Sequence, residues 1–299
     1  MQRVAFLGLG MMGGRQAGVL RRAGFDVRGW NRTPERADAW AAEHGGEVAA
    51  TPREAADGAD AVVSMVVDGR QAREVLLGED GAVHGLRDGA LVVDMTTTSP
   101  ADARRIGEAL GARGIAFLDA PVSGSLPKAQ AGTLTIMVGG EQAALDRARP
   151  LLDAMGETVI HAGPVGHGQA VKVITNAIAA VTCAAVGQAL VVGAKAGLDL
   201  DALIDAMAGS AAASAMVNLK ARPMRDHDYT PLFRLEHMLK DIRFALDEAH
   251  AAQAPFPLAA EAAELYAAAL ARGLGDGDFA GVIEAIEGLA GTSLGNTRL

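Results

Sequence analysis

The segment Gly166-His-Gly-Gln-Ala-Val-Lys172-Val-Ile-Thr-Asn176 places an amine and an amide at the start of an otherwise uncharged stretch. Lys172 and Asn176 are four residues apart, so in a helix they share one face. Desolvation lowers the pKa of an ammonium, and we expect that of Lys172 to fall towards about 7–8, where the amine exchanges a proton at working pH. Asn176 offers donors and an acceptor to a substrate. The alternative is a lysine that reaches solvent and an asparagine that bonds a neighbouring helix.

A second polar segment, Asp119-Ala-Pro-Val-Ser123-Gly124-Ser125, follows a predicted strand. Ligands of open α/β sheets bind at the carboxyl ends of the strands. The Ser123 hydroxyl and the backbone N–H groups of Gly124 and Ser125 could therefore hold a substrate carboxylate. The alternative is a plain turn between a strand and a helix.

A third segment, Asp94-Met-Thr-Thr97-Thr98-Ser99-Pro100, also follows a predicted strand, so its hydroxyl groups could face a nicotinamide ring. Thr98 or Ser99 could instead only cap a helix that begins at Pro100.

A fourth candidate is Lys240, which lies beside an apolar helical stripe within residues 233–244. It could reach a cofactor or an anionic substrate. A solvated pair with Asp241 or Glu236 is the alternative, and spacing alone favours it.

A glycine-rich loop behind the first predicted strand, Val4–Leu7, identifies the kind of cofactor. The spacing G-x-G-x-x-G ahead of a predicted helix over residues 12–23 is typical of dinucleotide-binding βαβ units. The glycines allow a tight turn, a close approach of the pyrophosphate and close packing of the helix, whose N-terminus points N–H groups at the phosphates. The expected cofactor-binding residues of the loop are Gly8, Leu9, Gly10, Met11, Met12 and Gly13.

The second predicted strand ends in Asn31-Arg32-Thr33, where NAD-binding proteins carry an acidic residue. A guanidinium and a hydroxyl favour a 2′-phosphate, which a carboxylate would repel. We therefore predict NADP(H) rather than NAD(H). Asn31 and Thr33 could also serve as turn and N-cap residues of a helix that begins at Pro34.

Strands and helices alternate up to Gly163-Pro164, which predicts an α/β fold with a Rossmann-type doubly wound parallel sheet. The expected strands cover 4–7, 27–30, 61–67, 90–95, 115–119, 134–138 and 158–161. From Gly166 onwards the pattern is all-helical. Helices are expected over 169–195, from Asp199 to Met207, and over 234–251, 258–272 and 280–288. We predict a cofactor domain over residues 1–164 and a helical domain over residues 165–299, joined by the long helix from Gln169.

Composition narrows the classes of function. The net charge of −9 over 299 residues disfavours a nucleic-acid partner. The single cysteine, Cys183, permits no disulfide and is expected to be buried, and no His or carboxylate cluster has metal-ligand spacing. The uncharged stretch Val173–Ala194 is long enough to cross a membrane, but its alanines and polar residues favour a buried core helix. No signal peptide precedes the first strand, so we expect a cytoplasmic location.

Taken together, the four polar segments and the glycine loop resemble the β-hydroxyacid dehydrogenase family, which includes 3-hydroxyisobutyrate dehydrogenases, tartronate semialdehyde reductases and glyoxylate or succinic semialdehyde reductases. The resemblance covers nearly the whole chain in the right order. It implies that Lys172 is the general acid/base, that Ser123, Gly124 and Asn176 bind the substrate, and that Lys240 approaches the nicotinamide ribose. It further implies cofactor contacts at Met65, Val66 and Thr97, and a homodimer or homotetramer packed through the long helix.

The resemblance is incomplete at Ser125, where the family commonly has a second glycine, and Leu126 and Pro127 also depart from common patterns. The identity of the small anionic substrate is therefore open. Lys172 argues against imine reductases, which usually replace this lysine. Two further alternatives are a non-catalytic NADP-binding sensor or scaffold and a decarboxylating dehydrogenase of the 6-phosphogluconate type, which is usually longer and carries a histidine after the lysine.

Overall fold

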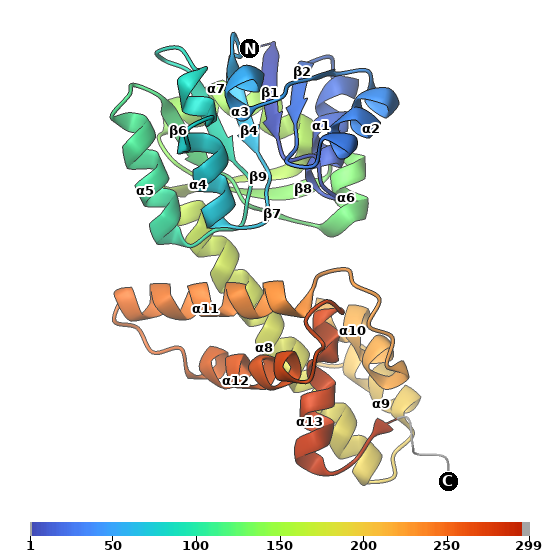
Figure 1. The fold of residues 1–299 in the computed structure, drawn as a ribbon. Helices are drawn as coiled ribbons and strands as arrows, with labels where there is room; N and C mark the ends of the chain where they lie inside the picture. The colour runs from blue at the N-terminus through green and yellow to red at the C-terminus, as the bar shows by residue number, and fades with distance from the viewer. Residues whose placement is uncertain (1, 295–299) are drawn as a thin grey trace. The chain divides into compact units, whose positions relative to one another are not determined.

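The computed structural model describes residues 2–294, and its contacts divide them into two compact units that meet in sequence at Lys172 and Val173. The first unit is built on a nine-stranded sheet in the order β3-β2-β1-β4-β5-β6-β8-β7, with β9 also paired to β8 (Figure 1). The strands are β1 Arg3–Leu7, β2 Asp26–Trp30, β3 Glu47–Val48, β4 Ala61–Ser64, β5 Leu91–Asp94, β6 Ala116–Asp119, β7 Val122–Ser123, β8 Leu134–Gly139 and β9 Gly156–Gly163.

The sheet confirms the doubly wound parallel arrangement from β3 through β6, where every pair is parallel. Strand β8 departs from it, because it runs antiparallel to β6 and β7 and parallel to β9. The strand expected over residues 61–67 ends at Ser64, and the next two residues, Met65 and Val66, lie against Gly8.

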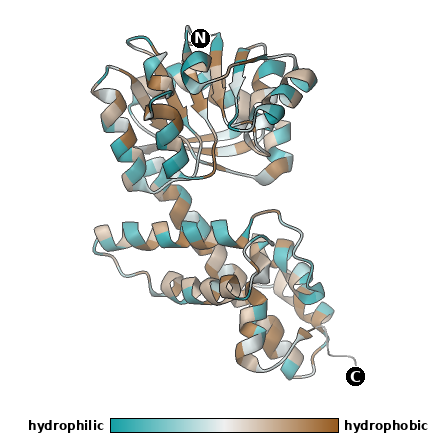
Figure 2. Ribbon diagram, in the orientation of Figure 1, coloured by the Kyte–Doolittle hydropathy of each residue, from teal (hydrophilic) through white to brown (hydrophobic). Residues whose placement is uncertain are grey.

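Helices cover both faces of the sheet: α1 Gly13–Arg22, α2 Pro34–His44, α3 Pro52–Ala56, α4 Gly69–Leu77, the short η1 Ala82–His84, α5 Pro100–Gly111, α6 Ser125–Ala131 and α7 Gln142–Met155. Alternate residues of β1 enter two different cores, with Val4 and Phe6 in one and Ala5 and Leu7 in the other. Burial on both faces explains the continuous apolar strands of this sheet, which Figure 2 shows in brown.

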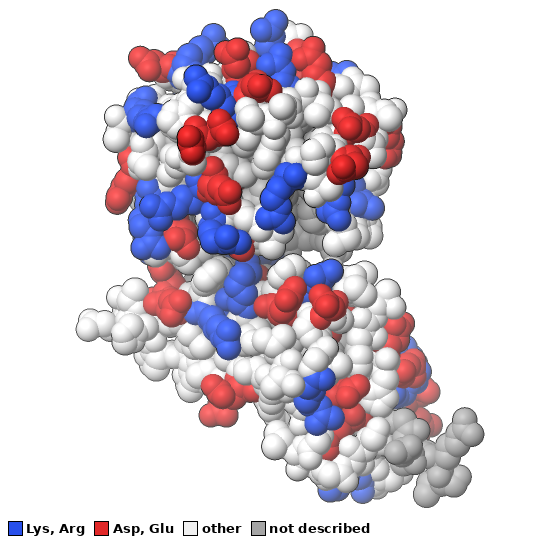
Figure 3. All heavy atoms as spheres, in the orientation of Figure 1, with Lys and Arg blue, Asp and Glu red and all other residues white. Residues whose placement is uncertain are grey.

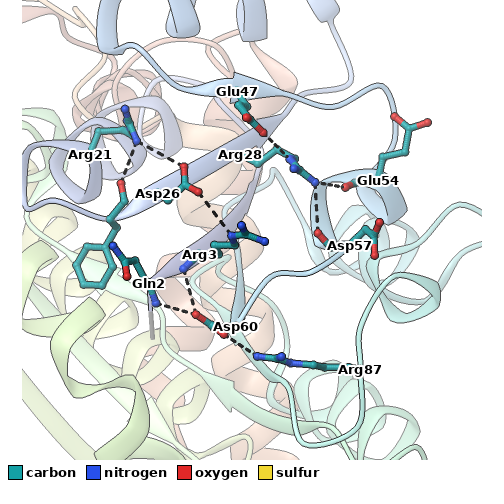
Figure 4. A network of polar contacts seen from close by, with 11 residues as sticks. Gln2, Arg3, Arg21, Asp26, Arg28, Glu47, Glu54, Asp57, Asp60 and Arg87 are labelled. Carbon is teal, nitrogen blue, oxygen red and sulfur yellow. Dashed lines mark hydrogen bonds and ion pairs between the residues drawn. The ribbon is translucent and has the colours of Figure 1, made fainter.

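A network of ion pairs and hydrogen bonds ties together the amino ends of the first strands (Figure 4). Asp60 accepts hydrogen bonds from Gln2 N at 2.7 Å and Arg3 N at 3.1 Å, and pairs with Arg87 at 2.6 Å. The two backbone donors lower the pKa of Asp60. These contacts lie at the opposite strand ends from the segments predicted to bind ligands, so we assign them to stability.

The second unit is helical and contains no named strand within the described residues. Its helices are the remainder of α8 His167–Lys195, then α9 Leu200–Ala208, α10 Ala215–Asp226, α11 Leu235–Ala251, α12 Pro257–Ala271, the short η2 Phe279–Val282 and α13 Ile283–Ala290. The sequence analysis missed α10, whose apolar pattern is interrupted by the buried Lys220 and by Pro223.

Helix α8 is long and apolar enough to cross a membrane, but half of its most hydrophobic window is buried inside the protein. Val173, Ala177, Ala180 and Cys183 follow a helical spacing into the core of the second unit. This burial agrees with the expected core helix, and Cys183 is a buried thiol whose pKa is raised to about 12 by desolvation.

Candidate active site

The glycine loop has the close contacts that its spacing predicts. Gly8 has φ +102°, and a Cβ there would strike the carbonyl oxygen of Met65, while a Cβ at Gly13 would strike the carbonyl oxygen of Gly8. At Gly10 nothing lies within 4 Å of the place of a Cβ. The first and third glycines therefore serve packing, and the second leaves the backbone open to a ligand.

The end of β4 lies directly against this loop. Met65 N donates to Leu7 O at 2.9 Å, and a Cβ on Gly8 would come within 3.0 Å of the Val66 side chain. Val66 N in turn donates to the Thr96 hydroxyl at 3.1 Å, which links it to the segment after β5. The structure thus brings Met65 and Val66 to the glycine loop, and Thr97 follows as a half-buried residue next to Thr96.

The Asn31-Arg32-Thr33 turn supports the glycine loop and leaves a cation exposed. Asn31 accepts a hydrogen bond from Leu9 N at 3.0 Å and donates to Thr33 O at 2.9 Å. Thr33 occupies the N-cap position of α2, but its hydroxyl makes no capping bond. Arg32 is exposed, and no residue within 2–294 pairs with its guanidinium. Asn31 is therefore a turn residue, while Arg32 and Thr33 are available for a phosphate.

Two buried side chains fix the N-terminus of α8 against the carboxyl ends of β5 and β6. Asp119 accepts hydrogen bonds from Gly166 N at 2.7 Å and Gln169 N at 2.8 Å. The Gln169 amide accepts from Thr98 N at 3.0 Å and donates to Thr96 O at 2.7 Å. Both side chains are fully buried. These bonds satisfy orphan N–H groups of the helix and hold the threonine segment to it.

Lys172 lies one helical turn after Gln169 and is 7% exposed. The start of this helix approaches the sheet closely, because a Cβ on Gly168 would come within 2.5 Å of Met137 O and 2.7 Å of Asp119 O. Strand β8 connects this contact to the substrate segment, since Ser123 pairs with Thr135 two residues before Met137. Lys172 is therefore nearly buried, and it follows a helix start that packs closely against the first unit.

The segment Ser123–Ser125, which the sequence predicts to bind the substrate, has an unusual backbone. Gly124 has φ +139°, and the next residue, Ser125, has φ +54°, which is in the left-handed region that favours glycine. Both Ser123 and Ser125 are exposed. The hydroxymethyl group that departs from the family pattern therefore stands at a position where a glycine would be unstrained.

In the second unit, the other predicted site residues form one contact chain. Asn176 donates to Asp241 at 2.7 Å, and Lys240 pairs with Asp241 at 3.3 Å. Asp241 is fully buried and the Lys240 side chain is about a quarter exposed, with its Nζ 5.3 Å from the centre of the Phe244 ring. The alternative given for Asn176 thus occurs, because it bonds another helix. Lys240 does pair with its neighbour, but that carboxylate is buried and not solvated.

A second buried carboxyl, Asp94, connects the ends of β4 and β5. It accepts from the Ser64 hydroxyl at 2.8 Å and from Thr96 N at 3.1 Å. Desolvation raises its pKa to about 6, with a smaller contribution from the negative charge of Asp119, its register partner on β6. Burial also raises the pKa of Asp119 itself.

Asp94, Asp119 and Gln169 are the positioning residues to which the sequence analysis gave no role. A weak signal existed for each, because all three are polar residues inside or beside apolar runs. Ser99, by contrast, has the capping role given as an alternative, since its hydroxyl accepts from Asp102 N at 3.0 Å.

Within residues 2–294 no group of three or more His, Cys, Asp or Glu side chains could hold a metal ion. On the face drawn in Figure 3, acidic and basic side chains are interspersed, and no continuous basic surface of the kind that binds nucleic acid is visible.

Comparison with known proteins identifies the family of this chain. Residues 3–163 match the family model described as the NAD binding domain of 6-phosphogluconate dehydrogenase, and residues 166–286 match the NAD-binding domain of NADP-dependent 3-hydroxyisobutyrate dehydrogenase. The chain belongs to the β-hydroxyacid dehydrogenase family. It is therefore an NAD(P)-dependent dehydrogenase or reductase of hydroxy acids.

Relatives in this family differ in substrate and cofactor. The chain is 35% identical to glyoxylate/succinic semialdehyde reductase 2 of Arabidopsis thaliana (95% of this chain, 79% of the relative). It is 36% identical to the NAD-dependent L-serine dehydrogenase of Pseudomonas aeruginosa (93% and 96%). A 3-hydroxyisobutyrate dehydrogenase structure from Mycobacterium tuberculosis, with L-serine, matches at TM-score 0.88 and 36% identity (96% and 99%).

Proposed function

We propose that the protein interconverts a small β-hydroxy acid and its semialdehyde with NADP(H), and that Lys172 is the general acid/base. The observation that carries the proposal is the placement of Lys172: a nearly buried amine on a helix whose N-terminus is bonded to the ends of the cofactor strands. A bound nicotinamide supplies the hydride transfer. The protein's part is to orient the substrate and to move one proton.

In the oxidative direction, neutral Lys172 Nζ takes the proton of the substrate hydroxyl, and in the reductive direction the ammonium returns it to the carbonyl oxygen. Ser123 and the N–H groups of Gly124 and Ser125 hold the substrate carboxylate. Asn176, oriented by Asp241, donates to or accepts from the substrate hydroxyl. Fixing the substrate at two points reduces the entropic part of the barrier.

The cofactor is proposed to bind along the glycine loop. The open backbone at Gly10 fits a pyrophosphate, and the exposed Arg32 and Thr33 fit a ribose 2′-phosphate. Met65, Val66 and Thr97 line the continuation of the loop, and Lys240 approaches the nicotinamide ribose. We also propose a homodimer or homotetramer in the cytoplasm, in analogy with other members of the family.

A panel of small hydroxy acids and semialdehydes, assayed with NADPH and NADH by absorbance of the reduced nicotinamide, tests the proposal. We expect Lys172→Ala to lose turnover by orders of magnitude while NADPH affinity, measured by fluorescence titration, stays the same. A wild-type protein that binds NADPH and turns over no member of the panel would favour a sensor or scaffold. Faster turnover with NADH than with NADPH would show that the interpretation of Arg32 is wrong.

A further inference from the structure

Lysine is rare in this chain, which has five lysines against twenty-two arginines. Most of the cations of this chain are therefore arginines. Four of the five lysines are buried or make a specific contact: Lys172, Lys195, Lys220 and Lys240. The fifth, Lys128, is exposed on α6, three residues after Ser125.

The stem of Lys128 lies against the substrate segment. A Cβ built on Gly124 would meet Cβ and Cδ of Lys128, both at 2.8 Å. The lysine stem thus fills the space that a side chain at position 124 would need. No residue within 2–294 forms a hydrogen bond or ion pair with its ammonium. The segment Ser123–Ser125 therefore has a cation beside it that the fold itself does not use.

We propose that Lys128 binds the anionic group of the substrate and so selects substrates with a negatively charged end over neutral ones. The inference deepens the proposed function and rests on it for the position of the substrate. The hydroxyl and N–H groups at Ser123–Ser125 are neutral donors, which also hydrogen-bond an oxygen of an uncharged substrate. An ammonium adds an attraction between two full charges, which an uncharged substrate does not have. In a protein of net charge −9, a local cation is also needed to attract such a substrate.

The alternative role of Lys128 is purely structural, because it lies in the last turn of α6, where a cation complements the helix dipole. The two roles differ in their consequences. A lysine that serves the dipole affects stability alone, whereas a substrate-binding lysine changes KM for charged substrates and leaves neutral ones unaffected.

The experiment compares Lys128→Met, which keeps the stem and removes the charge, with Lys128→Arg, which keeps the charge. Arg113→Met is the matched control, because Arg113 is an exposed cation beside the amino end of β6. The substrates are succinic semialdehyde and butanal, which has the same carbon chain without the carboxylate. We expect Lys128→Met to raise KM for succinic semialdehyde about tenfold with kcat nearly unchanged, and to leave kcat/KM for butanal unaffected. Lys128→Arg should recover most of the loss.

A binding measurement keeps this test separate from the proposed function. Malonate, a small dicarboxylate, is titrated into the wild type and the variants by calorimetry without any turnover. We expect its Kd to rise about tenfold in Lys128→Met and to stay the same in Arg113→Met. Equal malonate affinity in Lys128→Met and the wild type, or no binding to the wild type at tens of millimolar, overturns the role of Lys128. If the wild type turns over no substrate but binds malonate as expected, only the proposed function is overturned.

Discussion

Replacing Asp119 by asparagine tests whether the position of Lys172, the proposed general acid/base, depends on the contacts at the start of α8. The carboxylate accepts one bond on each oxygen, from Gly166 N and Gln169 N. An amide keeps one acceptor and turns an NH₂ group towards the other buried N–H. An unsatisfied buried donor costs about 1–3 kcal/mol. Asparagine also removes the cost of a buried charge, so we expect a loss of about 1–2 kcal/mol in the free energy of unfolding.

The effect on catalysis should be larger than this loss of stability suggests. Lys172 follows Gln169 by one turn, so a shift of the helix start moves the amine directly. A displacement of about 1 Å in an active site can lower the rate by about a hundredfold. We expect kcat of Asp119→Asn to fall by about ten- to a hundredfold, with the Kd of NADPH changed less than threefold. Urea unfolding followed by circular dichroism and steady-state kinetics at saturating NADPH measure both effects.

The control is Asp153→Asn, which removes a half-exposed carboxylate on α7 that pairs with Arg149. Exposed pairs contribute about 0–1 kcal/mol, so this variant should resemble the wild type in both assays. If Asp119→Asn loses stability but keeps full kcat, the carboxylate stabilises the fold without positioning Lys172. If neither the free energy of unfolding nor kcat changes, the two hydrogen bonds contribute neither to stability nor to the position of Lys172.

Three further changes have definite expected results. The pKa of Asp94 is about 6 in the folded protein against 3.8 for an ordinary aspartate, so the wild type loses stability as the pH rises through this range. Asp94→Asn should therefore gain up to about 3 kcal/mol in the free energy of unfolding, relative to the wild type, between pH 4 and pH 8. Urea titrations at these two pH values measure the difference. Ser125→Gly should raise the free energy of unfolding by about 0.5–1 kcal/mol by removing the strain of a serine at φ +54°, and unchanged stability in the same assay would show that this conformation is unstrained. Lys220→Met leaves the buried Asp278 without its partner at 2.7 Å and should cost about 3–5 kcal/mol, part of which Asp278→Asn should restore in the double variant.

The parts of the site that the sequence predicts are those whose chemistry depends on neighbours in the chain. The close contacts at Gly8 and Gly13 agree with the roles predicted for them, because turn geometry and close packing are local requirements of residue type and spacing. The approach of a pyrophosphate at Gly10 stays a prediction. The alternation of apolar runs with helical patterns likewise predicted the parallel part of the sheet. The strand over residues 134–138 was predicted as well, but the antiparallel direction of β8 was not, since nothing in its own residues distinguishes it from a parallel strand.

The residues that position the site could not be predicted, because their partners are far away in the sequence. Gln169 bonds Thr98 across 71 positions, and Asp119 bonds Gln169 across 50. A buried polar side chain only acquires a role once the fold supplies a partner, so single residues in apolar runs remain ambiguous. The positive φ of Ser125 was not predicted either, because serine has no preference for this conformation.

The boundary between the two units falls within one turn of α8, and this has a consequence for how the helix works. Lys172 and Asn176 are one helical turn apart, but they belong to different units. The helix start that carries Lys172 is fixed by Asp119 and Gln169 to strand ends of the first unit, whereas Asn176 is bonded to Asp241 on α11 of the second. Lys172, the proposed acid/base, thus follows a helix start that is bonded to the first unit, whereas Asn176, the proposed substrate ligand, is bonded within the helical unit. Within the helix itself, the backbone hydrogen bonds keep the spacing of side chains at i and i+4 constant, so the two sets of contacts act on residues one turn apart.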